Sequence, residues 1–71
     1  SGLTRRAMEE AERLYARAAS ELGDEHRLTK LLFSYASLAG TVDGLIKIIE
    51  AEQELLEVIA RENAGSTLVL L

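Results

Sequence analysis

The side chains that could take part in chemistry are few in this chain of 71 residues. His26 is the only histidine, it directly follows Asp24 and Glu25, and there is no cysteine. A hydrolytic triad needs a nucleophile held against an imidazole, and none of the five serines stands in a nucleophile-elbow pattern. The Glu-x-x-His spacing of di-metal helical bundles is absent, because Gly23 precedes His26 by three. We expect no enzymatic activity, no metal and no cofactor, and interpret His26 as a solvated residue near a helix N-terminus.

The formal net charge of −4 comes from one part of the chain. Residues 43–62 contain six carboxylates but only Lys47 and Arg61 as cations. An acidic chain with two tyrosines and one phenylalanine lacks the basic surface that nucleic acids or anionic membranes require. No apolar run approaches the roughly 20 residues of a membrane span, and no signal-peptide pattern is present. We expect a soluble protein whose partner is another protein or a second copy of itself.

The composition favours an all-α fold in a single helical domain, 1–71. There is no proline, and alanine, leucine and glutamate are abundant. With no disulfide available, so small a chain must be stabilised by close helix packing or by self-association. The predicted helices cover residues 3–22, 25–39 and 42–63, and residues 66–71 form an apolar tail.

Two joints separate the predicted helices. Gly23 is expected to stop the first helix in a left-handed conformation, and Asp24 to cap the second. Gly40 is expected to stop the second helix, Thr41 to cap the third, and Asp43 to lie favourably in its first turn. The short first joint makes the second helix fold back on the first. The expected architecture is an antiparallel three-helix bundle with an extended apolar C-terminal tail.

An alternative architecture keeps the helix unbroken through residues 40–44. It is favoured by a row of apolar side chains, the predicted seam, which crosses both glycines without losing its spacing of three and four residues. The seam contains Leu28, Leu31, Tyr35, Leu38, Val42, Leu45 and Ile49. A single helix over 25–63 would give a helical hairpin with a bare seam, which a dimer or a domain swap must cover. In the three-helix fold, the third helix is expected to bury Leu45, Ile46, Ile49, Leu56 and Ile59.

One aromatic residue lies away from this seam. At 100° per residue, Phe33 falls on the outer face of the second helix. Its expected neighbours there are small or polar: His26, Thr29, Lys30, Ala36, Ser37 and Gly40. Such a face suits a protein partner with Phe33 as the anchor. In the opposing interpretation Phe33 is buried against the C-terminal tail.

Three functional interpretations therefore stay open, and the third, a minor enzymatic one, rests on His26 alone. The first is a protein-binding module, whether natural or engineered, that uses the outer face around Phe33. The second is a structural, self-assembling bundle that forms a homo-oligomer through its seam and its aliphatic tail. The tail residues expected to self-associate are Leu68, Val69, Leu70 and Leu71.

Two resemblances accompany these expectations. Residues 15–26 resemble the helical death motif that survival proteins of the Bcl family bind. Leu22-Gly23-Asp24-Glu25 matches its core, and the resemblance implies that Asp24 pairs with an arginine of the partner. Ala19 stands where that motif has its signature leucine. The initial Ser-Gly, which resembles a cleaved tag, and the short glycine joints also make the chain similar to engineered or computationally designed small helical bundles.

Overall fold

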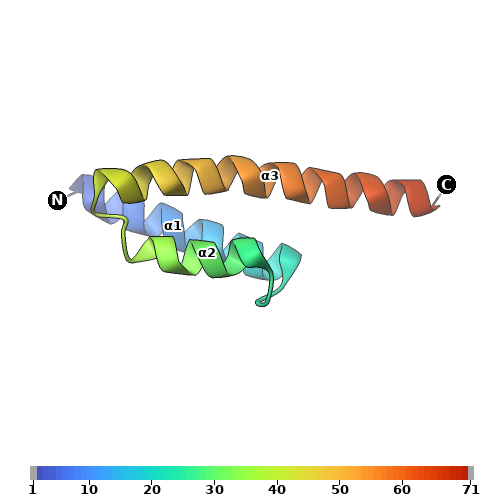
Figure 1. Cartoon of the computed structure of the whole chain (residues 1–71), viewed down its shortest axis with the longest axis horizontal. Helices are drawn as coiled ribbons and strands as arrows, with labels where there is room; N and C mark the ends of the chain where they lie inside the picture. Colours follow the sequence, from blue (N-terminus) through green and yellow to red (C-terminus); the bar gives the residue numbers. More distant parts are fainter. Residues whose placement is uncertain (1, 71) are drawn as a thin grey trace.

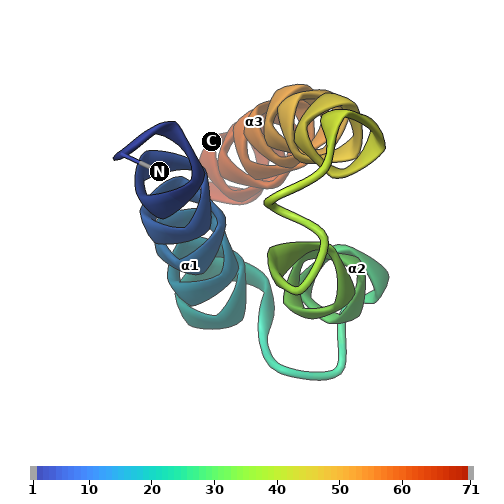
Figure 2. The ribbon, with the colours of Figure 1, turned by 90° about the vertical axis from the view of Figure 1, so that its left-hand side faces the viewer.

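The computed structural model of the chain describes residues 2–70, except for the side chains of Leu3 and of residues 66–70. Three helices make up the fold: α1 (Gly2–Leu22), α2 (Arg27–Ala36) and α3 (Val42–Leu70). In Figure 1, α2 runs antiparallel to the other two helices, which are parallel to each other. Figure 2 shows the helices at the corners of a triangle. The predicted all-α three-helix bundle is therefore confirmed.

A small apolar core lies along the axis of the triangle. α1 contributes a row of alanines around Leu14, which lets the neighbouring helices approach closely. The buried hydrophobic residues are Ala11, Leu14, Ala18, Leu28, Leu32, Ala39, Ile48, Ala51, Leu55 and Ile59. Because α2 has only ten residues, it is too short to be stable alone and depends on this packing.

The joint between α1 and α2 is built around Gly23. This residue adopts the expected left-handed conformation, with φ of 91°, and its N–H donates to the carbonyl of Ala19 at 3.1 Å. The expectation that Asp24 caps α2 is wrong. His26 is the N-cap, and its Nδ1 accepts the backbone N–H of Leu28 at 3.1 Å.

The joint between α2 and α3 is a true break. α2 ends at Ala36, three residues before the predicted end, and turns cover residues 37–40. The predicted cap of the third helix is confirmed, because Thr41 Oγ1 accepts the N–H of Gly44 at 2.9 Å. Asp43 lies in the first turn of α3 as expected. The alternative single helix over 25–63 is not formed.

The inward face of α3 differs from the predicted one. Ile46, Ile49 and Leu56 are 49%, 56% and 47% exposed, and Val42 of the predicted seam is 73% exposed. Of the five residues expected inside, only Ile59 is buried, and Leu45 is half-buried. The row that enters the core instead is Gly44, Ile48, Ala51, Leu55 and Ile59. α3 therefore carries two apolar rows, and the bundle buries the one that contains Gly44 and Ala51.

Cross-helix ion pairs flank the buried row and favour this rotation of α3. Arg13 of α1 donates to Glu52 at 3.4 Å, and Arg27 of α2 pairs with Glu54. Residues 52 and 54 lie about 160° apart around a helix, on opposite sides of the Ala51–Leu55 row. If α3 were rotated so that Ile46, Ile49 and Leu56 faced the core, at least one of these two ion pairs would break.

The C-terminal part of α3 corrects a further expectation. Asn63-Ala-Gly65 does not stop the helix, whose backbone continues to Leu70. The extended tail predicted for residues 66–71 is therefore wrong over 66–70, and Leu71 lies outside the described residues. α3 projects beyond the ends of α1 and α2 (Figure 1), and residues 60–65 are exposed. Over residues 2–70, no helix is both long enough and apolar enough to cross a membrane.

Candidate protein-binding surface

Phe33 lies on the surface of α2, beside α1. Its side chain is 69% exposed, so it is not part of the core. Its ring centroid lies 5.5 Å from that of Tyr15 on α1, with the ring planes inclined by 59°. This tilted geometry is favourable for two aromatic rings, and it holds the Phe33 ring over the space between the two helices.

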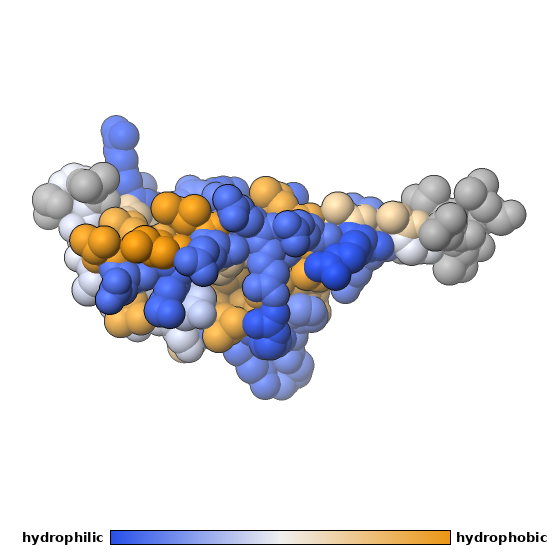
Figure 3. All heavy atoms as spheres, turned by 45° about the horizontal axis from the view of Figure 1, so that its top comes forward, coloured by the Kyte–Doolittle hydropathy of each residue, from blue (hydrophilic) through white to orange (hydrophobic). Residues whose placement is uncertain are grey.

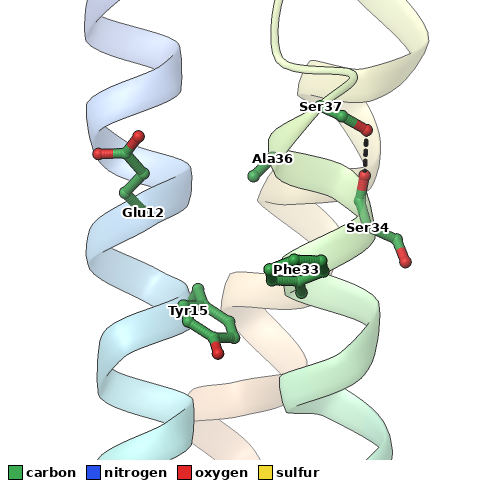
Figure 4. Close-up of a pocket in the computed structure, with 6 residues that line it drawn as sticks. All are labelled: Glu12, Tyr15, Phe33, Ser34, Ala36 and Ser37. Atoms are coloured by element: carbon green, nitrogen blue, oxygen red, sulfur yellow. Dashed lines mark hydrogen bonds between the residues drawn. The ribbon is translucent and has the colours of Figure 1, made fainter.

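An open groove with a volume of about 490 Å³ begins at this aromatic pair. α1 contributes Glu12 and Tyr15 to its lining. α2 contributes Phe33, Ser34, Ala36 and Ser37. Figure 4 shows the Ala36 methyl group directed toward α1 and the two rings at one end of the groove. We call this groove and its two rings the Phe33 face.

A second hollow of about 300 Å³ lies on the other side of the aromatic pair. Asp24 and Lys30 line it together with both rings. Lys30 is exposed, and its Nζ lies 3.1 Å from a carboxylate oxygen of Glu25. The aromatic pair is thus a ridge between an apolar groove and a hollow that carries both signs of charge.

The structure brings only some of the predicted site residues to this face. Phe33, Ala36 and Ser37 line the groove, and Thr29 and Lys30 line the second hollow. His26 is half-buried and engaged as the N-cap of α2. Gly40 follows the end of α2, and a Cβ built there would lie 3.6 Å from Thr4 of α1, so Gly40 does not line the groove.

Thr29 lines the second hollow, but the expectation that it lies exposed on the outer face of α2 is wrong. Its side chain is 1% exposed, and its hydroxyl donates to the carbonyl of Gly23 at 2.8 Å. A threonine on the border between the core and the surface can satisfy its hydroxyl within the chain while it packs its methyl group. Thr29 thus stabilises the α1–α2 joint.

Sequence reasoning missed the contribution of α1 to this surface. Tyr15 is half-buried at the rim of the groove. Neither Glu12 nor Ser34 belongs to a sequence pattern that indicates a binding surface. The contact between Tyr15 and Phe33 depends on the rotation of two helices about their axes, which a single sequence does not specify.

An ion-pair cluster links α1 to α3. Arg13 donates to both carboxylate oxygens of Glu10, one of them at 3.1 Å, and also reaches Glu52. Hydrogen bonding from Arg13 holds the pKa of Glu10 below its ordinary value. Among the described side chains, no cluster of three metal-ligating residues occurs.

The residues predicted to self-associate lie at the C-terminal end of the chain. The side chains of Leu68, Val69 and Leu70, and the whole of Leu71, lie outside the described residues. Self-association through them stays a prediction.

Searches of protein-family models, of curated proteins and of solved structures find no match to this chain.

Proposed function

We propose that this protein is a non-enzymatic protein-binding module, and that the Phe33 face is its contact surface. The observation that carries the proposal is the 69% exposure of Phe33 in a bundle with a single phenylalanine. Leaving a large aromatic side chain in water forfeits about 1.5–3 kcal/mol of burial free energy, which a bound partner would recover.

The surroundings of Phe33 support this use. Residues that dominate binding energy are enriched in aromatic side chains and lie in pockets from which water is excluded. The Tyr15 ring packs against one side of the Phe33 ring, which reduces the side-chain freedom that would be lost on binding. Ser34, Ala36 and Ser37 are short and leave the groove open to an incoming side chain.

The groove also indicates what the partner would present. Its accessible lining is mostly apolar, and Glu12 supplies the one carboxylate. A partner would insert an aliphatic or aromatic side chain against the two rings, with a basic or hydrogen-bond-donating group near Glu12. This class of ligand matches the general pattern of apolar pockets with a few polar groups that fix orientation.

Peptide selection tests the proposal without a known partner. A displayed library of random peptides is selected on the immobilised protein, and the enriched peptides are titrated against wild type, Phe33→Ala and Met8→Ala. Met8 is 47% exposed and does not line the groove, so its variant is a matched control. Loss of one anchoring aromatic should weaken binding by at least about tenfold, or 1.4 kcal/mol.

Circular dichroism must show that Phe33→Ala is folded before its binding is compared. Enriched peptides that bind Phe33→Ala as tightly as wild type would contradict the proposal. Equal weakening by Met8→Ala would contradict it as well, because the effect would then not belong to the Phe33 face.

A further inference from the structure

A separate apolar surface runs along the outside of α3. Val42, Ile46, Ile49 and Leu56 are between 47% and 73% exposed. Together with Gln53 they follow spacings of four, three, four and three residues, so they share one face of the helix. We call this face the outer stripe of α3. Figure 3 shows apolar side chains gathered over the first half of α3, between hydrophilic ones.

The outer stripe has the pattern of one strand of a coiled coil. Its residues occupy alternately the a and d positions of a heptad, and Gln53 is the one polar residue among them. A single polar residue at such a position specifies the register of pairing at some cost in stability. Within the described residues no other helix covers the stripe, because α1 and α2 pack against the opposite side of α3 (Figure 2).

A row of carboxylates borders the outer stripe. Asp43, Glu50 and Glu57 are exposed, and each immediately follows a stripe residue at a spacing of seven. The cations nearby are engaged elsewhere. Arg13 pairs with Glu10 and Glu52, Lys47 lies over the Tyr35 ring at 5.9 Å, and Arg61 donates to the backbone carbonyl of Glu57 at 3.4 Å. The side chains of this row make no ion pair within the described part of the chain.

This charge pattern opposes pairing with a second copy. In an antiparallel pair, the row formed by Asp43, Glu50 and Glu57 would face the same row of the other copy. In a parallel pair, Glu52 of one copy would approach Glu57 of the other. Like charges placed opposite one another across a helix interface are destabilising, so the row selects against self-association.

We propose that the outer stripe of α3 is a second protein-binding surface that takes an amphipathic helix with a basic border. The partner helix lays an aliphatic stripe against Ile46, Ile49 and Leu56 and presents Lys or Arg to Glu50 and Glu57. The apolar stripe supplies affinity, and the carboxylate row supplies orientation and rejection of acidic partners. The surface is independent of the Phe33 face, which faces α1 on the other side of the bundle.

Two synthetic peptide helices test the proposal. Both carry the same Ile and Leu stripe over three heptads, one with lysine and the other with glutamate at the bordering positions. Fluorescence anisotropy titrations of the full chain should show that the lysine peptide binds at least tenfold more tightly. Its affinity should fall between 50 mM and 500 mM salt, since screening shortens the reach of the carboxylate row.

Variants of the chain separate the two surfaces. Ile49→Ser keeps the net charge and should weaken the lysine peptide at least tenfold, while Phe33→Ala and Met8→Ala leave its affinity unchanged. Glu50→Gln combined with Glu57→Gln should remove most of the preference for lysine over glutamate. Because these three positions are exposed, the variants should retain the wild-type circular dichroism spectrum.

Several results would overturn the inference. Equal binding of the two peptides would remove the role of the carboxylate row. Loss of binding in Phe33→Ala instead of Ile49→Ser would move the ligand to the Phe33 face. Light scattering that shows a wild-type dimer, converted to monomer by Ile49→Ser, would make a second copy the occupant.

Discussion

Replacing Gly44 by alanine should destabilise the protein strongly, although residue 44 lies in α3 and alanine has a higher helix propensity than glycine. A Cβ built on Gly44 would lie 1.8 Å from the carbonyl oxygen of Leu38, whereas ordinary contact begins at 3.4 Å. The turn must therefore retreat by about 1.6 Å. That carbonyl accepts hydrogen bonds from both the N–H and the hydroxyl of Thr41, at 3.0 and 2.8 Å, which hold it in place.

The expected magnitude follows from three contributions to the free energy of unfolding. Losing two hydrogen bonds costs about 1 kcal/mol each. Overpacking costs about 1–3 kcal/mol, and the helix propensity of alanine returns up to about 1 kcal/mol. Gly44→Ala should thus lower the stability by about 2–4 kcal/mol, which for a domain of this size lowers Tm by at least about 8 °C.

Gly65→Ala is the matched control, because it makes the same substitution in the same helix. Among the described residues, no atom outside the adjoining helix backbone lies within 4 Å of a Cβ built on Gly65, so the substitution should be neutral or raise Tm slightly. Thermal unfolding followed by circular dichroism at 222 nm measures both variants. If Gly44→Ala is as stable as Gly65→Ala, the close approach of the turn to α3 is wrong.

Three further predictions concern the joints and the charges. Thr29→Val should cost about 1 kcal/mol in urea unfolding, since it removes a buried hydroxyl that donates to the Gly23 carbonyl, and an unchanged midpoint would contradict that bond. His26→Ala should cost about 1 kcal/mol through loss of the N-cap, and His26→Asn should recover most of it, whereas equal stability of both would refute the capping role. Arg13→Gln should raise the pKa of Glu10 in an NMR titration. Because Arg13 lowers this pKa in the folded state, the stabilisation from the pair is present near neutral pH and is lost as pH falls through the pKa of Glu10.

The sequence alone specified the order of the helices and the joints between them. Gly23 and Thr41 act through local geometry, a left-handed backbone and a side-chain cap, so their roles could be predicted from residue type and position. The cap of α2 was assigned to Asp24 because aspartate is the stronger capping residue, yet the chain places His26 there instead. Boundaries shift by a few residues when tertiary contacts favour another cap.

The rotation of α3 could not be predicted, because the helix has two apolar rows. The row with Ile46 and Ile49 is the more hydrophobic, which made it the expected core face. The row with Gly44 and Ala51 is smaller and lets α3 approach its neighbours closely. Close packing favours the smaller row, and the exposed pair between Arg27 and Glu54 adds a small contribution. Both depend on three-dimensional contacts between helices.

The Phe33 face was predicted in part. Helical periodicity placed Phe33 on the outside of α2, and its exposure agrees with that position. The same periodicity placed Thr29 outside, although α2 lies against both α1 and the joint, so a threonine on that border is covered. The Tyr15 ring, which contacts Phe33, belongs to α1, so the periodicity of α2 alone does not predict this contact.

The most direct test of a surface-exposed Phe33 compares two neighbouring residues of α2. Leu32 is fully buried and Phe33 is 69% exposed. Urea unfolding should show that Leu32→Ala loses about 2–5 kcal/mol or does not fold, while Phe33→Ala loses less than about 1 kcal/mol. A loss from Phe33→Ala as large as that from Leu32→Ala would show that the ring is part of the core, and the proposed binding surface would not exist.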